Sequence, residues 1–126
     1  MKVSIPVSVG ELADKITILE IKSKKIKDRD SLYEINKELT LLMSIFTKKN
    51  ININKIKSEL DKLRKINKKL WIIEDKKRNH EKIKKFDSKF IELARNVYKL
   101  NDQRAMAKLN INKITKSHII EIKSYN

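Results

Sequence analysis

Residues 56–74, IKSELDKLRKINKKLWIIE, decide the fold, because their seam positions recur every three or four residues. Those positions are Ile56, Leu60, Leu63, Asn67, Leu70 and Glu74. Alternating steps of three and four residues are typical of a helix that packs along a narrow seam, as in a coiled coil. The pattern predicts one long helix over about residues 55–83.

The stretch 90–111, FIELARNVYKLNDQRAMAKLNI, repeats this spacing. Its seam positions are Phe90, Ala94, Val97, Asn101, Arg104, Lys108 and Ile111. Asp87 stands before the repeat as a helix cap, so a second long helix is expected over about residues 87–115. Only residues 84–86 are left for a turn, which predicts that the two long helices form an antiparallel hairpin.

Two shorter helices are expected before this hairpin. The first follows a capping box and runs to about residue 26, and the second runs to about residue 46. The capping residues are Ser8 with Glu11, then Asp28 or Asp30, and then Asn52 or Asn54 in a loop over 50–54. The apolar positions of the second helix are Leu32, Ile35, Leu39, Leu42 and Phe46.

Composition limits the fold class. The 126 residues suit a single domain, 1–126, and one Gly with one Pro leaves little material for tight β-turns. Residues 3–7 and 119–123 are rich in β-branched side chains and are expected to be extended arms or a short ribbon. We therefore predict an all-α fold: an antiparallel bundle of about four helices with short extended terminal arms.

The net charge of +15 suggests nucleic-acid binding but does not establish it. Only five of the 31 basic residues are Arg, the residue usually chosen to recognise phosphates and bases specifically. The chain is also rich in Lys, Ile and Asn, whose codons are AT-rich, so an AT-rich genome would raise the Lys content without selection for phosphate binding. Nucleic-acid binding is kept as an alternative and is not favoured.

Several site chemistries have little support. Cys is absent, so disulfides, thiolate metal sites and Cys nucleophiles are excluded. Glu11 and Asp14 stand one turn apart and could hold a hard cation, but capping explains the first and solvation the second. No cofactor or metal is expected. The sequence has no leader-like N-terminus and no run of about 20 apolar residues for a membrane span, which predicts a cytoplasmic protein.

Polar residues interrupt the predicted seams in a pattern. The candidate ligand-binding residues are Asn67, Trp71, Glu74 and Arg78 on the third helix, Asn101, Arg104 and Lys108 on the fourth, and Glu20 at the edge of the apolar face of the first. Folding the hairpin places Asn67 opposite Arg104, and Glu74 within about a turn of Asn101. These side chains are therefore expected to face one another.

Two interpretations of these residues stay open. They could form a network of salt bridges that fixes the register of the helices, as polar seam residues do in coiled coils. Alternatively, Arg104, Lys108 and Arg78 could hold an anion, with Glu74 as an acid, a base or an orienting group. The mixed second side of the first helix, which includes Asp14, predicts a further neighbour in this chain or in a second subunit.

Four blocks of the sequence resemble an uncharacterised bacterial family of short helical proteins, a domain of unknown function. The blocks are PVSVGEL with DKITILEIK over 6–22, LWIIED over 70–75 with Arg78, ARNVY with NDQRA over 94–105 with Lys108, and EIKSY over 121–125. A second uncharacterised helical family is similar around Trp71, Glu74, Asp75 and Arg78. The resemblance implies a helical fold, a bacterial or phage source and genes for surface polysaccharides and glycosyltransferases nearby; it implies no activity and no catalytic residues.

The function favoured at this stage is a non-enzymatic interaction or accessory protein that self-associates and is linked to surface-polysaccharide biosynthesis. The first alternative is an enzyme or binder for a phosphorylated metabolite or a nucleotide sugar. A metal-dependent nucleotide pyrophosphatase is a weaker alternative, because a second well-spaced acidic pair is missing. Whether the chain is an enzyme is left open, and a homo-oligomer or a protein partner is expected.

Overall fold

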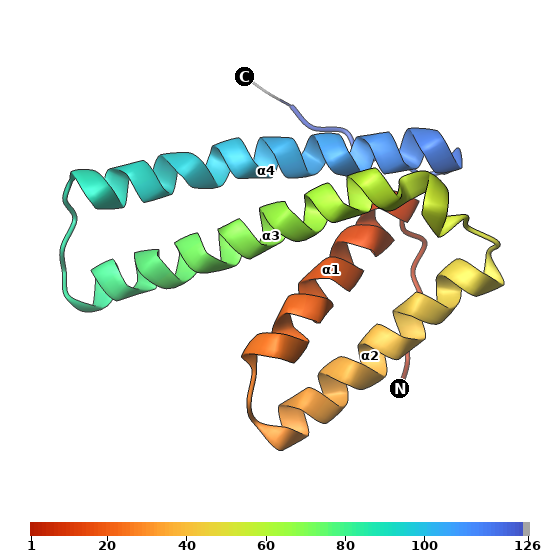
Figure 1. Ribbon diagram of the computed structural model, residues 1–126, viewed down its shortest axis with the longest axis horizontal. Helices are drawn as coiled ribbons and strands as arrows, with labels where there is room; N and C mark the ends of the chain where they lie inside the picture. The colour runs from red at the N-terminus through yellow and green to blue at the C-terminus, as the bar shows by residue number, and fades with distance from the viewer. Residues whose placement is uncertain (125–126) are drawn as a thin grey trace.

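The computed structural model describes residues 1–124, and this part of the chain is all-α, without a strand (Figure 1). The helices are α1 (Val9–Lys25), α2 (Arg29–Lys48), α3 (Ile53–Lys82) and α4 (Ser88–Thr115). Each begins after a side chain that accepts a backbone N–H of its first turn; the four caps are Ser8, Asp28, Asn52 and Asp87. The predicted all-α class is confirmed. Tyr125, the last residue of the family blocks, lies outside the described residues.

Three of the helices end through a left-handed residue. Asn50, Lys84 and Lys116 follow α2, α3 and α4 and have φ angles of 54°, 54° and 52°. In each case the next amide donates to a carbonyl of the last helical turn, for example Lys85 N to His80 O at 2.9 Å. Glycine is the usual residue in this conformation, so the two lysines carry a backbone strain that the hydrogen bonds offset.

The four helices form two hairpins that meet at one end (Figure 1). α1 packs on α2, α3 and α4, and α3 packs along α4, whereas α2 packs mainly on α1. The core lies where the first half of α1 meets the start of α3 and the end of α4. Its buried members are Leu12, Ala13, Ile16, Phe46, Ile56, Leu60, Leu63, Ala107 and Ile111.

The seam of the α3–α4 hairpin is fully buried at this core and partly exposed at the far end. Ile56 and Leu63 are fully buried, whereas Leu70 and Val97 are half-buried. The predicted packing of α3 along α4 is confirmed, but Asn101, a predicted seam residue, is exposed. Beyond the end of α1, α3 and α4 have only each other as neighbours.

Among residues 1–124, no helix combines the length and the apolar character that a membrane span requires.

Candidate functional site

The site begins where α1 touches α4 most closely, at Gly10. Its amide donates to the side-chain oxygen of Asn112 at 2.7 Å, and Asn112 is 2% exposed. A Cβ at this position would overlap the backbone carbonyl of Lys108. The lone glycine of the chain is therefore needed for the close approach of two helices, a role that the sequence did not reveal.

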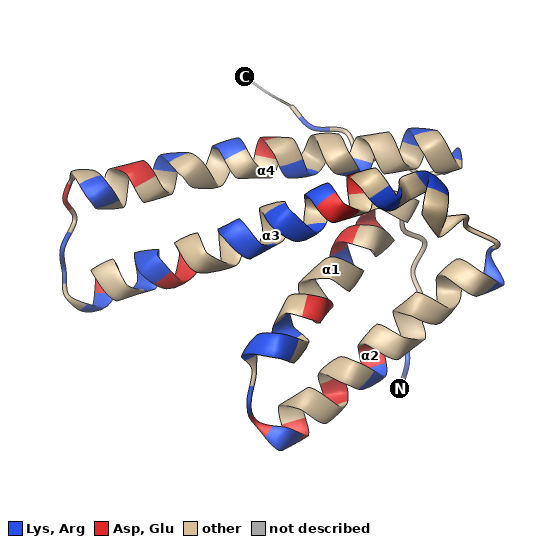
Figure 2. Ribbon diagram, viewed as in Figure 1, with Lys and Arg blue, Asp and Glu red and all other residues tan. Residues whose placement is uncertain are grey.

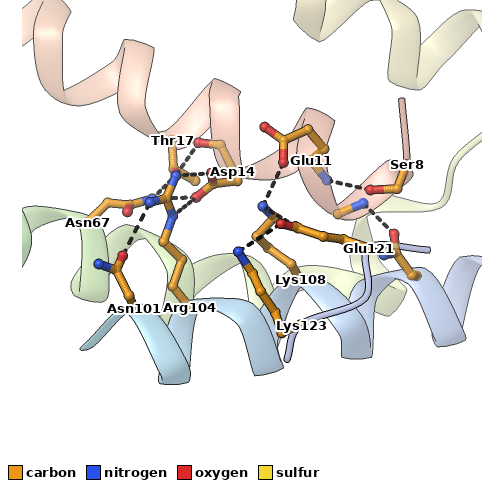
Figure 3. Close-up of polar contacts among 12 residues, drawn as sticks. Ser8, Glu11, Asp14, Thr17, Asn67, Asn101, Arg104, Lys108, Glu121 and Lys123 are labelled. Atoms are coloured by element: carbon orange, nitrogen blue, oxygen red, sulfur yellow. Dashed lines mark hydrogen bonds and ion pairs between the residues drawn. The ribbon is translucent and has the colours of Figure 1, made fainter. Parts of the chain in front are cut away.

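One turn further along α1, the Asp14 carboxylate lies at the centre of a buried polar cluster (Figure 3). Arg104 binds this carboxylate with two parallel hydrogen bonds: Nε donates to Oδ1 at 2.8 Å, and Nη2 donates to Oδ2. Asn67 Nδ2 donates to the same Oδ1 at 2.9 Å. Asp14 is 1% exposed, so this carboxylate needs all of these donors.

The neighbours of Asp14 satisfy one another as well. Asn67 also donates to Thr17 Oγ1 at 2.8 Å, and the Thr17 hydroxyl donates to the Asp14 carbonyl at 2.8 Å. Arg104 Nη1 reaches Asn101 Oδ1 at 3.4 Å on the exposed side. No buried side-chain nitrogen or oxygen of the described residues lacks a partner. We call Asp14, Thr17, Asn67 and Arg104 the polar cluster.

The electrostatics of the polar cluster follow from these contacts. The hydrogen bonds to the Asp14 carboxylate raise the pKa of the Arg104 guanidinium above its usual range, and partial burial opposes this only in part. Arg104 is therefore a fixed cation whose charge the carboxylate cancels. An anionic ligand at Arg104 would have to displace a bidentate partner that is almost fully buried.

Lys108 forms a second group of ion pairs, which ties the C-terminal arm to the helices (Figure 3). Its Nζ lies 2.6 Å from Glu11 and 2.8 Å from Glu121, and Lys123 lies 2.9 Å from the other oxygen of Glu121. Burial lowers the pKa of Lys108, but the hydrogen bonds to Glu11 and Glu121 outweigh it, so the pKa is raised. The two lysines lower the pKa of Glu121 from 4.5 to about 2.

The remaining predicted site residues make no bond to these two groups, although Trp71, Glu74 and Arg78 line one hollow together with Asn67 and Arg104. Glu20 accepts from Arg64 Nε at 2.9 Å and Nη2 at 3.2 Å, so it joins α1 to α3. Glu74 lies 3.7 Å from Lys77 on its own helix. Trp71 is half-buried and Arg78 is exposed.

Of the two pairings expected across the hairpin, one is observed: Asn67 and Arg104 meet through a shared carboxylate. Within residues 1–124, no hydrogen bond or ion pair joins Glu74 to Asn101. α1 contacts α3 and α4 of the same chain, which supplies the further neighbour that its second side predicts.

The sequence did not identify Asp14 as the centre of the site, nor Thr17, Glu121 and Arg64 as partners. The signal that could have found Asp14 is its place on the second side of α1, three residues before Thr17 and four before Ile18. A carboxylate among apolar residues on one side of a helix is expected to be buried. If the facing helix carries a cation at the same level, the two are expected to form an ion pair.

Within residues 1–124, no three His, Asp or Glu side chains gather as ligands for a metal ion. Glu11 and Asp14, the weak candidates from the sequence, point to different cations, Lys108 and Arg104. Both carboxylates thus join α1 to α4 through ion pairs.

The comparison with protein families agrees with the resemblance found in the sequence. A family model described as a family of unknown function, DUF6165, matches residues 1–126. The chain belongs to this family. No curated protein and no solved structure matches it. The DUF6165 match covers all three elements of the polar cluster, α1, α3 and α4.

Proposed function

We propose that this DUF6165 protein is a non-enzymatic interaction protein that self-associates. The observation that carries the proposal is a surplus of exposed surface. A compact folded monomer of 14.9 kDa exposes about 7,000 Å², whereas this chain exposes 9438 Å². The terminal arms contribute exposed apolar side chains to this surplus, and so do two helical surfaces.

The first surface is the outer side of α2, which packs mainly on α1. Tyr33, Leu41 and Met43 are 67%, 43% and 50% exposed, and Phe46 is the one buried residue of the helix. An amphipathic helix with one main neighbour leaves apolar area in water, and soluble monomers rarely expose large apolar patches without a partner. This surface therefore suits a protein contact.

The second surface is the end of the α3–α4 hairpin, residues 76–98, which we call the hairpin end. Its exposed apolar side chains are Ile83, Phe86, Ile91 and Tyr98. It also carries eight basic and three acidic residues. The start of α2 has the opposite balance, because residues 28–38 hold four acidic and two basic residues.

These two surfaces are complementary in charge and alike in apolar character. We infer that α2 of one copy lies against the hairpin end of a second copy. A two-fold axis would repeat the contact, so each chain would bury both of its open surfaces. Opposite charges across such an interface speed association and fix its orientation, which matters for a chain of net charge +15.

The polar cluster supports an interaction protein over an enzyme. Arg104 and Lys108 are the cations that an anionic substrate would need, and both already hold carboxylates. Glu74, the expected acid or base, lies outside the cluster. Lys and Arg are distributed over all four helices rather than along one stripe, which also argues against a nucleic-acid groove (Figure 2). The link to surface-polysaccharide biosynthesis and a cytoplasmic location stay predictions from the family resemblance and the sequence.

Light scattering coupled to size-exclusion chromatography tests the proposal. The expected mass is twice the 14.9 kDa of the chain. Met43→Glu places a charge on the α2 surface and should shift the mass toward that of one chain. Met106→Glu is the matched control, because Met106 is 57% exposed on α4 but outside both surfaces, and it should leave the mass unchanged.

Two results would overturn the proposal. One is a mass of one chain at every soluble concentration of the unmodified protein. The other is equal dissociation by Met43→Glu and Met106→Glu, with helix content unchanged by circular dichroism in both. That result would mean that added charge, rather than the α2 surface, controls association.

A further inference from the structure

A pocket lies where the last two turns of α1 diverge from the middle of α3. Its volume is about 340 Å³, within the range of roughly 300–1,000 Å³ that is usual for small-molecule sites. It is lined by Ile21, Lys24, Lys25, Lys68, Trp71 and Ile72. The floor is therefore apolar and aromatic and the rim is basic. No lining residue belongs to the polar cluster, to α2 or to the hairpin end.

The three lysines of the rim have no carboxylate to balance their charge. Like most lysines of the described residues, Lys24, Lys25 and Lys68 have no carboxylate within ion-pair distance; what sets them apart is that all three line one pocket. Glu20 stands one turn before Lys24, but Arg64 already holds both of its oxygens. The rim thus presents three uncompensated positive charges around one opening.

Trp71 offers an aromatic surface for binding, in addition to the charges of the lysines. Its ring is half-buried, and within residues 1–124 it makes no ring contact and no hydrogen bond. A tryptophan face that is open to a basic pocket can stack on a planar heterocycle, because every base offers a π-face of matching size.

The charges around Trp71 also predict the orientation of a ligand that binds there. The ring also borders a second hollow, whose lining holds the carboxylates of Glu74 and Asp75 together with three cations, Lys22, Arg78 and Arg104. Charges of both signs meet in that hollow, whereas the only charged side chains of the first pocket are lysines, so the first pocket attracts phosphates more strongly. A ligand with both an aromatic ring and a phosphate would therefore bind with its phosphates toward Lys24, Lys25 and Lys68.

We propose that this pocket binds a nucleoside phosphate, with the base stacked on Trp71 and the phosphate groups held by the three lysines. The site is separate from Arg104 and Lys108, where the sequence placed an anion. It is also independent of self-association, because it uses none of the α2 or hairpin-end residues. The same chemistry could come from a free nucleotide or from one residue of a single strand, and the experiment distinguishes these sources.

Fluorescence measures binding directly, because Trp71 is the single tryptophan of the chain. UDP and ADP are titrated into the protein, with uridine, adenosine, inorganic phosphate and a single-stranded oligonucleotide as separate arms. N-acetyltryptophanamide corrects for absorption by the bases. Saturable quenching by at least one diphosphate is expected, with its nucleoside about tenfold weaker or more, because the nucleoside lacks the groups that the lysines hold.

Variants locate the site. Lys68→Ala and the double change Lys24→Ala with Lys25→Ala should each weaken binding about tenfold. Lys57→Ala is the matched control, because Lys57 is also exposed on α3 and has no ion-pair partner among the described residues, and it should have no effect. Trp71→Phe, followed by calorimetry, should weaken binding but keep the preference for the diphosphate over its nucleoside.

Several outcomes would overturn the inference: no saturable quenching by either diphosphate, equal binding of a diphosphate and its nucleoside, or equal weakening by Lys68→Ala and Lys57→Ala. Tight binding of the oligonucleotide with no binding of a free nucleotide would overturn the assignment to a nucleoside phosphate and would favour a nucleic-acid surface. Light scattering on the same variants separates this result from the first proposal, because loss of nucleotide binding should leave the mass unchanged.

Discussion

The ion pair between Asp14 and Arg104 should be strongly asymmetric in its contribution to stability. The Asp14 side chain is 1% exposed and that of Arg104 is 29% exposed. Arg104→Ala leaves a buried carboxylate with only Asn67 as its side-chain donor. Breaking a buried pair from this side should lower the free energy of unfolding by about 3–5 kcal/mol.

The reverse change should cost less. Asp14→Asn keeps the shape of the side chain and removes the charge, and the freed guanidinium can turn toward water on its exposed side. A loss of about 1–2 kcal/mol is expected, close to that of a lost hydrogen bond to a charged group. In the Arg104→Ala background, however, Asp14→Asn should raise stability, because it removes the charge that had lost its partner.

Urea unfolding measures these differences, at one low chain concentration so that association does not add to the result. Arg64→Ala is the control, because the Arg64–Glu20 pair has 37% and 25% exposed side chains and should contribute about 1 kcal/mol or less. The reasoning is refuted if Arg104→Ala costs no more than Arg64→Ala. It is also refuted if Asp14→Asn lowers stability in both backgrounds, since Asp14 would then not be a buried charge.

Three further outcomes follow from the structure. Lys116→Gly should raise the free energy of unfolding by about 1 kcal/mol, because Gly adopts the left-handed conformation without strain. Asn50→Gly should raise it by less, since Asn tolerates this conformation. Urea unfolding compares the two variants. Gly10→Ala should lower stability by about 1–3 kcal/mol through overlap with α4, and a gain in stability would contradict the close approach. Because the pKa of Glu121 is lowered to about 2, its ion pairs stabilise the docked C-terminal arm fully above pH 4.5, the ordinary pKa of a glutamate, and this stabilisation is lost as the pH falls toward about 2. Carbon-detected NMR of the Glu121 carboxyl group measures its pKa. Titration of this group near pH 4.5 in the folded protein would contradict the ion pairs.

The sequence predicted the helices well, because their signals are local. Caps such as Asp28 and Asp87 and the three-to-four spacing depend only on neighbouring residues. The spacing did not predict how deeply each seam residue is buried, because periodicity shows which side of a helix is apolar and does not show how many helices cover it. Glu74 is the clearest case: it holds a seam position and is half-buried, yet its ion-pair partner is Lys77 on its own helix.

The polar cluster was only half predictable, for a related reason. Asn67 and Arg104 interrupt two long apolar patterns, so they stand out. Asp14 does not, because α1 has three helical neighbours and its apolar residues surround most of the helix. The pairing of Glu121 with Lys108 depends on the path of the C-terminal arm, which no local rule gives.

The position of α1 connects the polar cluster with both proposed contacts. Gly10 and Asp14 hold the first half of α1 close to α4 and α3, whereas the last turns carry Lys24 and Lys25 and no bond to α4. Beyond the pair of Glu20 with Arg64, the last turns of α1 diverge from α3, and the pocket beside Trp71 lies there. α2 follows α1 and reaches the common core only near its end, at Phe46. The position of α1, set by Gly10 and Asp14, therefore shapes both the proposed pocket and the exposed α2 surface on which the proposed self-association depends.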